Sequence, residues 1–216
     1  MSNRHERLQR AVLYLVCGDR DDAFLEAAIR GGVDIVQLRM KDASDEDVLA
    51  AGRRFRRVCA THDVLLIVND SPELAAAAGA DGVHLGQDDA SVAEARAVLG
   101  EERLIGRSTH TPAQIDAANG DSGADYIGVG PVHETPTKPG RPAVGLELVR
   151  YAAAHATLPF FTIGGITGEN VAAVRHAGAR RIAVVRALTE AADPEAAARR
   201  LRVPLERTQE AGVGAA

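Results

Sequence analysis

The chain has 216 residues, enough for one large core or one barrel, and no shift in composition marks a second domain. Aromatic residues make up 3% and the formal net charge is −5, which argues against an aromatic platform for nucleic acids and against a nonspecific polyanion binder. No CxxC pair, signal peptide or apolar run of about 18 residues is visible, so we expect buried thiols at Cys17 and Cys59, no membrane partner and a cytoplasmic location.

Short apolar segments alternate with helical segments along the whole chain. Strands are predicted at 11–17, 33–39, 64–70, 81–86, 103–108, 124–130, 159–165 and 180–186. Helices are predicted at 21–32, 44–62, 71–79, 91–100, 111–119, 146–156, 167–178 and 193–201, and the tail 203–216 is expected to fray. Ser44 and the Ser71-Pro72 pair are typical residues for the start of a helix.

Eight strand–helix units in strict alternation predict parallel strands joined by right-handed crossovers. We therefore expect one domain, residues 1–216, folded as a single (β/α)8 TIM barrel of the α/β class, with an open doubly wound sheet as the alternative. An internal echo, a similar tripeptide that recurs along the chain, supports the assignment of the strands. Each copy ends a helix and begins an even-numbered strand; the copies are Gly32-Val33-Asp34, Gly79-Ala80-Asp81, Gly123-Ala124-Asp125 and Gly178-Ala179-Arg180.

A long loop, Gly128–Gly145, follows the sixth strand. It contains four prolines together with Thr135, Thr137, Lys138 and Arg141. Prolines restrict the backbone, and hydroxyls with cations suit an anionic, phosphorylated ligand. Loops of this length are usually functional, although a rigid surface loop with solvated charges is the alternative.

Polar residues also occur at the ends of the other predicted strands, where barrel enzymes place their catalytic groups. Alternation puts Gln37, Arg39 and Lys41 on one side of the second strand. The other strand ends carry Asn69, Asp70, Gln87, Asp88, Asp89, Ser108, Gly164, Gly165, Val185 and Arg186.

Two anion sites are predicted from these residues. Asp70 and Asp89 could share one Mg²⁺ ion, since Mg²⁺ is held by one or two carboxylates plus substrate phosphates and water. Asp88 competes with Asp89 for this role, and the alternative is that both aspartates merely lead into helices. The first site would add Arg39, Lys41, Ser108 and Lys138 to the metal, and the second would comprise Thr135, Thr137, Gly165 and Arg186.

The histidines do not suggest a nucleophilic triad. His84 lies inside a predicted strand and is expected to be a hydrogen-bonded core residue, whereas roles for His110 and His133 near the rim stay open. Cys17 has no obvious activating neighbour in the sequence.

Several motifs together resemble the thiamine phosphate synthase family. They are QLRMK (37–41), VND (68–70), ADGVHLGQDD (80–89), GRSTHT (106–111), GVGPVHETPTKPGRPAVGLELV (128–149) and IGGI (163–166). The resemblance implies a (β/α)8 barrel transferase that joins 4-amino-2-methyl-5-hydroxymethylpyrimidine diphosphate to a thiazole phosphate or carboxythiazole phosphate. It implies that the C–O bond ionises first and that the thiazole nitrogen captures the pyrimidine cation.

The resemblance also implies roles for individual residues. The pyrimidine diphosphate would be held by Gln37, Leu38, Arg39, Met40, Lys41, Asn69, Ser108 and Lys138, of which Arg39, Ser108 and Lys138 would be catalytic. The thiazole phosphate would be held by Thr135, Pro136, Thr137, Gly165, Val185 and Arg186, and Asp70 and Asp89 would bind one Mg²⁺. This chain departs from many relatives at His133-Glu134, where an aromatic residue is common, and at Arg186, where serine is common.

Two other functions stay open from the sequence. A thiazole tautomerase is a related barrel, but it needs no diphosphate site. The aspartate pair and Lys138 indicate such a site and therefore argue against a tautomerase. A non-catalytic barrel that binds a phosphorylated ligand would bind thiamine phosphate without turnover. The expected partners are small phosphorylated molecules rather than nucleic acid, and the oligomeric state is open, a homo-oligomer included.

Overall fold

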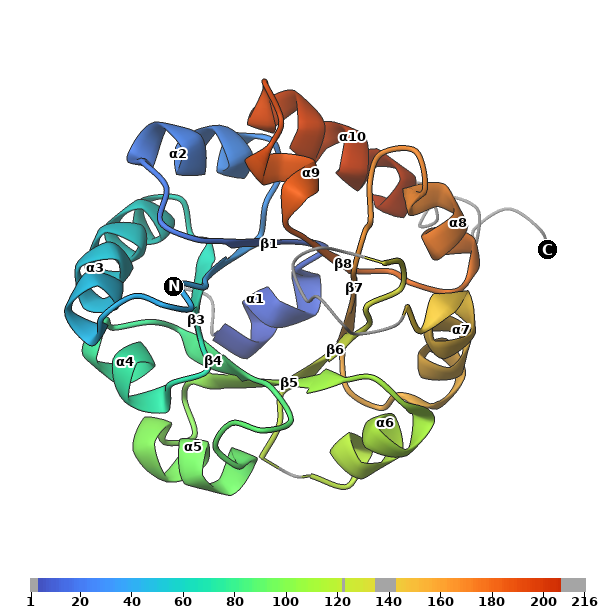
Figure 1. The fold of residues 1–216 in the computed structure, drawn as a ribbon, viewed down its shortest axis with the longest axis horizontal. Helices are drawn as coiled ribbons and strands as arrows, with labels where there is room; N and C mark the ends of the chain where they lie inside the picture. Colours follow the sequence, from blue (N-terminus) through green and yellow to red (C-terminus); the bar gives the residue numbers. More distant parts are fainter. Residues whose placement is uncertain (1–3, 122, 135–142, 207–216) are drawn as a thin grey trace.

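The computed structural model describes residues 4–121, 123–134 and 143–206. Its eight parallel strands pair with their neighbours in chain order, and β1 pairs with β8 to close the barrel (Figure 1). The strands are β1 Leu13–Cys17, β2 Ile35–Leu38, β3 Leu65–Asn69, β4 Gly82–Leu85, β5 Leu104–Thr109, β6 Tyr126–Val129, β7 Phe160–Ile163 and β8 Ile182–Val184. The predicted (β/α)8 barrel is confirmed, and the open-sheet alternative is wrong.

Helices of the described residues surround the barrel (Figure 1). They are α2 Asp22–Arg30, α3 Asp45–Thr61, α4 Pro72–Ala77, α5 Val92–Leu99, α6 Pro112–Asn119, α7 Gly145–His155, α8 Val171–His176 and α10 Pro194–Glu206. The expected caps are present, since the Ser44 and Ser71 side chains accept hydrogen bonds from the backbone N–H groups of Asp47 and Leu74. Across the described ranges, no helix has the length and apolar character needed to cross a bilayer.

Three helical features differ from the sequence prediction. Helix α1, Arg4–Arg10, is not among the predicted helices, and neither is the short α9, Arg186–Thr189, whose first residue falls in the predicted eighth strand. Helix α10 continues five residues beyond the predicted end at 201, so the fraying expected from 203 is wrong as far as Glu206. Leu201 and Leu205, one helical turn apart, are both buried and hold this last turn against the core.

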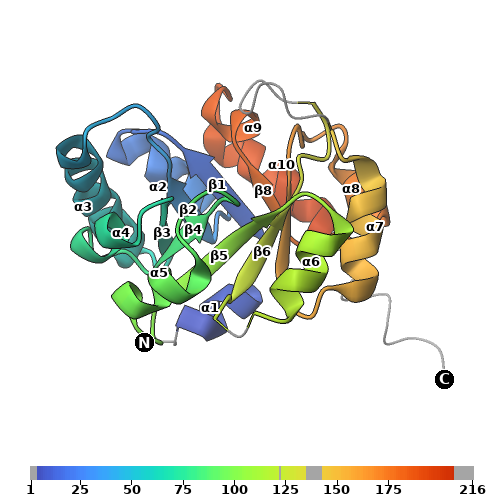
Figure 2. The same ribbon diagram turned by 60° about the horizontal axis from the view of Figure 1, so that its bottom comes forward.

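The barrel interior is a separate apolar cluster, closed at one end by α1. Figure 2 shows α1 at the end of the barrel opposite α9, and Figure 1 shows it behind the barrel opening. Leu8 of α1 is 1% exposed and packs with Tyr14, Tyr126 and Phe161 of the interior. Because α1 covers the amino-terminal ends of the strands, the barrel is closed at that end (Figure 2).

The internal echo in the sequence has a structural basis at this closed end. Asp34, Asp81 and Asp125 each precede an even-numbered strand and accept hydrogen bonds from backbone N–H groups at the start of the preceding odd one. Each carboxylate also pairs with arginine: Arg202 with Asp34, Arg4 and Arg56 with Asp81, and Arg96 with Asp125. Ahead of β8, where the echo has no aspartate, the backbone carbonyl of Arg181 accepts from the N–H of Thr162 instead.

Candidate active site

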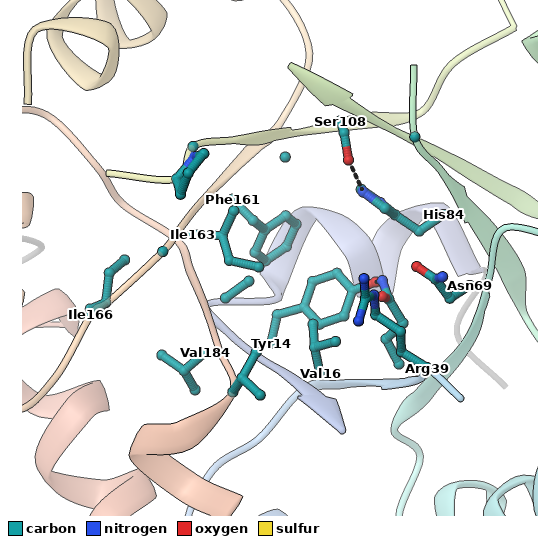
Figure 3. Close-up of a pocket in the computed structure, with 18 of the residues that line it drawn as sticks. Tyr14, Val16, Arg39, Asn69, His84, Ser108, Phe161, Ile163, Ile166 and Val184 are labelled. Atoms are coloured by element: carbon teal, nitrogen blue, oxygen red, sulfur yellow. Dashed lines mark hydrogen bonds between the residues drawn. The ribbon is translucent and has the colours of Figure 1, made fainter. Parts of the chain in front are cut away.

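A cavity of about 720 Å³ lies at the carboxyl ends of the strands, and all eight strands contribute to its lining. It brings together ten of the predicted site residues: Gln37, Arg39, Lys41, Asn69, Asp70, Asp89, Ser108, Gly165, Val185 and Arg186. Figure 3 shows Arg39, Asn69 and Ser108 around one side of this cavity and Ile166 and Val184 across from them. Residues far apart in the sequence therefore share one site.

Of the other predicted residues, the described ones, Leu38 and Met40, do not line the cavity. The side chain of Leu38 is 1% exposed and packs with the helices outside the barrel, and Met40 packs against the same apolar cluster. These two side chains alternate with those of Gln37, Arg39 and Lys41, as expected for extended backbone. Thr135, Pro136, Thr137 and Lys138 lie outside the described residues.

Asp70 and Asp89 form a carboxyl pair at one side of the cavity. Asp70 follows β3 with a left-handed backbone, φ 68°, that turns the chain into α4. Burial, and next the hydrogen bond and charge of Asp89, raise the pKa of Asp70 to about 6, while Lys41 and Arg39 act in the opposite direction. Two carboxyls this close cannot both ionise easily without a cation, so the pair suits a proton or a metal ion.

The loop after β4 holds Asp89 in place. The Asp89 carboxylate accepts a hydrogen bond from the backbone N–H of Gly86 at 2.6 Å, and the Gln87 side chain donates to the Ser108 carbonyl at 2.6 Å. Arg107, which is not among the predicted site residues, donates to the carbonyls of Gln87 and Ala90. Asp88 also lines the cavity but is exposed, so Asp89 is the better placed partner for Asp70.

The base of the long loop packs on the end of β7. The backbone N–H groups of Val132 and His133 donate to the carbonyls of Ile163 and Gly164, and Val144 donates to Pro131, which joins the two ends of the loop. Gly164 and Gly165 have φ of 111° and 61°, and a Cβ on Gly164 would lie 2.5 Å from the Cα of Pro131. Only glycine allows the two segments to approach so closely.

The three rim residues on which the sequence left questions have distinct environments. Arg186 donates from Nε to the Glu190 carboxylate at 2.8 Å, a bond that raises the pKa of Arg186. His110 lines the cavity and its Nδ1 hydrogen-bonds to the Gly130 carbonyl, so it supports the start of the long loop. The Nε2 atom of His133 is buried without a partner among the residues that the structure describes, and this side chain is not part of the cavity lining.

A chain of hydrogen bonds crosses the floor of the cavity. The Gln37 amide nitrogen donates to the Tyr14 hydroxyl at 2.7 Å, and the two tyrosine hydroxyls, of Tyr14 and Tyr126, are 3.0 Å apart. His84 follows, with Nδ1 3.3 Å from the Tyr126 hydroxyl and Nε2 3.0 Å from the Ser108 hydroxyl (Figure 3). His84 is thus hydrogen-bonded, as predicted, and it also lines the cavity.

Two tyrosines were missed in the sequence, although a signal for them exists. Tyr14 and Tyr126 are buried in the barrel interior, where burial raises the pKa of both hydroxyls, and Phe161 packs edge-on against both rings. Gly106 makes room for the Tyr126 ring, since a Cβ at this position would lie 2.2 Å from the ring. The inward positions of alternate residues in β1 and β6 would have indicated both tyrosines.

Comparisons with known proteins point to one family. A family model described as thiamine monophosphate synthase matches residues 13–188. A thiamine-phosphate synthase of Thermobifida fusca is 52% identical over 203 residues, covering 91% of this chain and 93% of the relative. A thiamine-phosphate synthase of Synechocystis is 46% identical over 94% of this chain, which spans 59% of that longer relative. The solved structure of a thiamine phosphate pyrophosphorylase from Pyrococcus furiosus superposes with a TM-score of 0.84 at 29% identity, covering 95% of this chain and 98% of that one.

Proposed function

The chain belongs to the thiamine monophosphate synthase family, and we propose how its cavity performs the transferase reaction that forms thiamine phosphate. The substrates would be 4-amino-2-methyl-5-hydroxymethylpyrimidine diphosphate and a thiazole phosphate. The bond between the pyrimidine methylene carbon and the diphosphate oxygen breaks and takes its electron pair to diphosphate. A bond from the thiazole nitrogen to the same carbon then forms.

One observation carries this proposal: the carboxyl pair and two cations lie in the same cavity. Asp70 and Asp89 are close enough that one raises the pKa of the other, and Arg39 and Lys41 act on the same carboxyl. Carboxylates alone would repel a diphosphate. Cations alone could bind a diphosphate, and the carboxylates would then have no role in binding it. The combination suits a diphosphate that arrives with a divalent metal ion.

The donor set fits magnesium only in part. No group of three or more acidic, histidine or cysteine side chains that could hold a metal is present among the described residues. Mg²⁺ typically keeps water and substrate phosphate oxygens as ligands, so two carboxylates are sufficient. When bound beside Asp70 and Asp89, the ion would supply electrostatic stabilisation to the leaving diphosphate.

The protein side chains have the remaining tasks. Arg39, Lys41 and Ser108 would bind and neutralise the developing diphosphate charge, which is the main requirement of an ionising C–O bond. Asn69 and Gln37 would orient the pyrimidine, with backbone atoms of Leu38 and Met40 alongside. Across the cavity, Gly165, Val185 and Arg186 would hold the thiazole phosphate, with Thr135, Pro136, Thr137 and Lys138 of the long loop contributing as the sequence predicts. Both reactants would then face each other in one enclosure.

A single assay tests the proposal. The purified protein is mixed with both substrates and Mg²⁺, and thiamine phosphate and diphosphate are quantified. Omitting either substrate, or adding a chelator, should abolish product. Asp70→Asn and Asp89→Asn should each abolish activity while the circular dichroism spectrum is retained, whereas Asp88→Asn, next to the pair but exposed, should retain most of it.

The outcomes separate the alternatives. Full activity in both aspartate variants or with chelator would disprove the metal role, but the proposed reaction would still stand. Isomerisation of the thiazole without coupling would indicate a tautomerase, and tight binding of thiamine phosphate without turnover would indicate a binding barrel. A cytoplasmic location and a homo-oligomeric assembly remain predictions, which cell fractionation and light scattering would examine.

A further inference from the structure

The hydrogen-bond chain Gln37–Tyr14–Tyr126–His84–Ser108 joins opposite sides of the cavity through five strands. Its two ends, Gln37 and Ser108, are both buried and both line the cavity. The two central hydroxyls belong to Tyr14 and Tyr126, residues that are 2% exposed or less. Buried polar groups need hydrogen-bond partners, so each member of this chain has to satisfy its neighbours.

The number of protons in the chain gives it a direction. A tyrosine hydroxyl has one proton, and a neutral imidazole has one N–H and one bare nitrogen. Because the amide nitrogen of Gln37 donates to the Tyr14 oxygen, the proton of Tyr14 is available to the Tyr126 oxygen 3.0 Å away. In that arrangement Tyr126 would donate to Nδ1 of His84, and a neutral imidazole would carry its proton on Nε2, facing Ser108.

We propose that this hydrogen-bond chain is a directional coupler, meaning that all its hydrogen bonds run in one direction. Tyr14, Tyr126 and His84 are positioning residues that fix whether Gln37 and Ser108 offer a donor or an acceptor to the substrates. Since the Ser108 oxygen accepts from His84, its own proton points to the cavity and donates to an anion. Since the Gln37 nitrogen is committed to Tyr14, its carbonyl oxygen accepts a hydrogen bond in the cavity.

The coupling defines a ligand class. It selects a heterocycle with an N–H donor next to Gln37, combined with an anionic group next to Ser108. This inference rests on the proposed function only for the identity of the two substrates. The polarity itself follows from the side chains and can be measured without turnover.

The direction of the hydrogen bonds predicts that the side chain at position 37 controls which ring nitrogen of His84 is protonated. In Gln37→Glu the carboxylate can only accept, so Tyr14 has to donate to it and each later link reverses. Tyr126 then accepts from His84, which requires a proton on Nδ1. A purely structural role for these hydrogen bonds predicts no such change at His84. Among the described residues, the hydrogen bonds from position 37 to His84 run through the two tyrosines.

The test is nitrogen-15 NMR of the histidine side chains in the full-length chain, with His84 assigned by the loss of its signals in His84→Gln. In the unsubstituted protein we expect Nε2 of His84 to be protonated and Nδ1 to be bare, with and without diphosphate plus Mg²⁺ as the probe. In Gln37→Glu the Nδ1 resonance should move to the frequency range of protonated ring nitrogens.

The matched control is the double variant Gln37→Glu with Tyr126→Phe. It keeps the added charge but removes the link, so the His84 signals should equal those of Tyr126→Phe alone. A protonated Nδ1 with a bare Nε2 in the unsubstituted protein overturns the proposal even if a variant does not fold. It is also overturned if Gln37→Glu leaves Nδ1 bare, or if the double variant still shifts it.

A kinetic measurement separates this inference from the reaction. If no thiamine phosphate forms but the NMR result is as expected, the proposed function fails and the coupler stands. If product forms, a pyrimidine diphosphate with an oxo group in place of the amino group should lose at least about tenfold in kcat/KM. That loss should shrink in Tyr126→Phe, because Gln37 can then turn its amide.

Discussion

Replacing Asp70 by asparagine should stabilise the metal-free protein while it abolishes activity. Burial and the neighbouring Asp89 raise the pKa of Asp70 from 3.8 to about 6. The folded state therefore disfavours the ionised carboxylate, and at pH 7 this cost is present in full. An amide of the same shape does not ionise, so Asp70→Asn removes the cost.

The size of the effect follows from linkage. An increase from 3.8 to about 6 corresponds to about 3 kcal/mol if it is fully transmitted to folding. Asp70 is only half-buried, and solvent screening reduces this to about 1–2 kcal/mol. Well below pH 3.8 the carboxyl is protonated in both the folded and unfolded states, so the stabilisation should vanish there, grow as the pH rises from about 3.8 to about 6, and level off above that.

Urea unfolding of both proteins between pH 3.5 and 8, with chelator present, measures this difference. Asp88→Asn serves as the control and should change the free energy of unfolding by less than about 0.5 kcal/mol. Addition of Mg²⁺ with diphosphate should reverse the order, because only the unsubstituted protein gains from binding. A free energy difference that is independent of pH, or a destabilised Asp70→Asn, would refute the reasoning.

Four other predictions concern single residues. Gly106→Ala should lower stability by about 1–3 kcal/mol in urea unfolding because its methyl group meets the Tyr126 ring, while Gly168→Ala, which meets no atom within 4 Å, should not. Thr162→Val should raise stability by about 1 kcal/mol, since the Thr162 hydroxyl is buried without a partner among the described residues; a loss would contradict this. Asp81→Asn should lower stability by about 1–3 kcal/mol in the same assay, as its charged hydrogen bonds to Arg4, Arg56 and Leu66 weaken. Lys138→Ala should lower turnover by about 10²-fold or more, and a rate near that of the unsubstituted enzyme would remove the long loop from the reaction.

The barrel was predictable because its signals are local. Strand and helix alternation, the caps at Ser44 and Ser71 and the glycine-aspartate echo each depend on neighbouring residues in sequence. Helix α1 was missed because only one of its side chains, Leu8, is buried, which leaves no helical periodicity to detect. Helix α9 is a single turn, too short for any periodicity.

The candidate site was predictable where residues cluster at strand ends, as for Asp70 and Asp89. The hydrogen-bond chain was not, because Tyr14, Tyr126 and His84 are separated by 42 to 112 positions along the chain. Their meeting depends on the barrel register, in which His84 lies opposite Gly106 and Gly106 lies opposite Tyr126. No sequence pattern states which inward side chains will meet across a closed sheet.

The aspartates at the closed end of the barrel also affect its open end. Asp34, Asp81 and Asp125 each bind the start of the preceding strand twice, once through the carboxylate and once through their own backbone N–H. Each pair of bonds fixes the stagger between two neighbouring strands. In a closed barrel the total stagger, or shear, and the strand number together determine the tilt and the radius. Three carboxylates far from the substrates thus help to determine the width of the open end of the barrel, where the two reactants must meet.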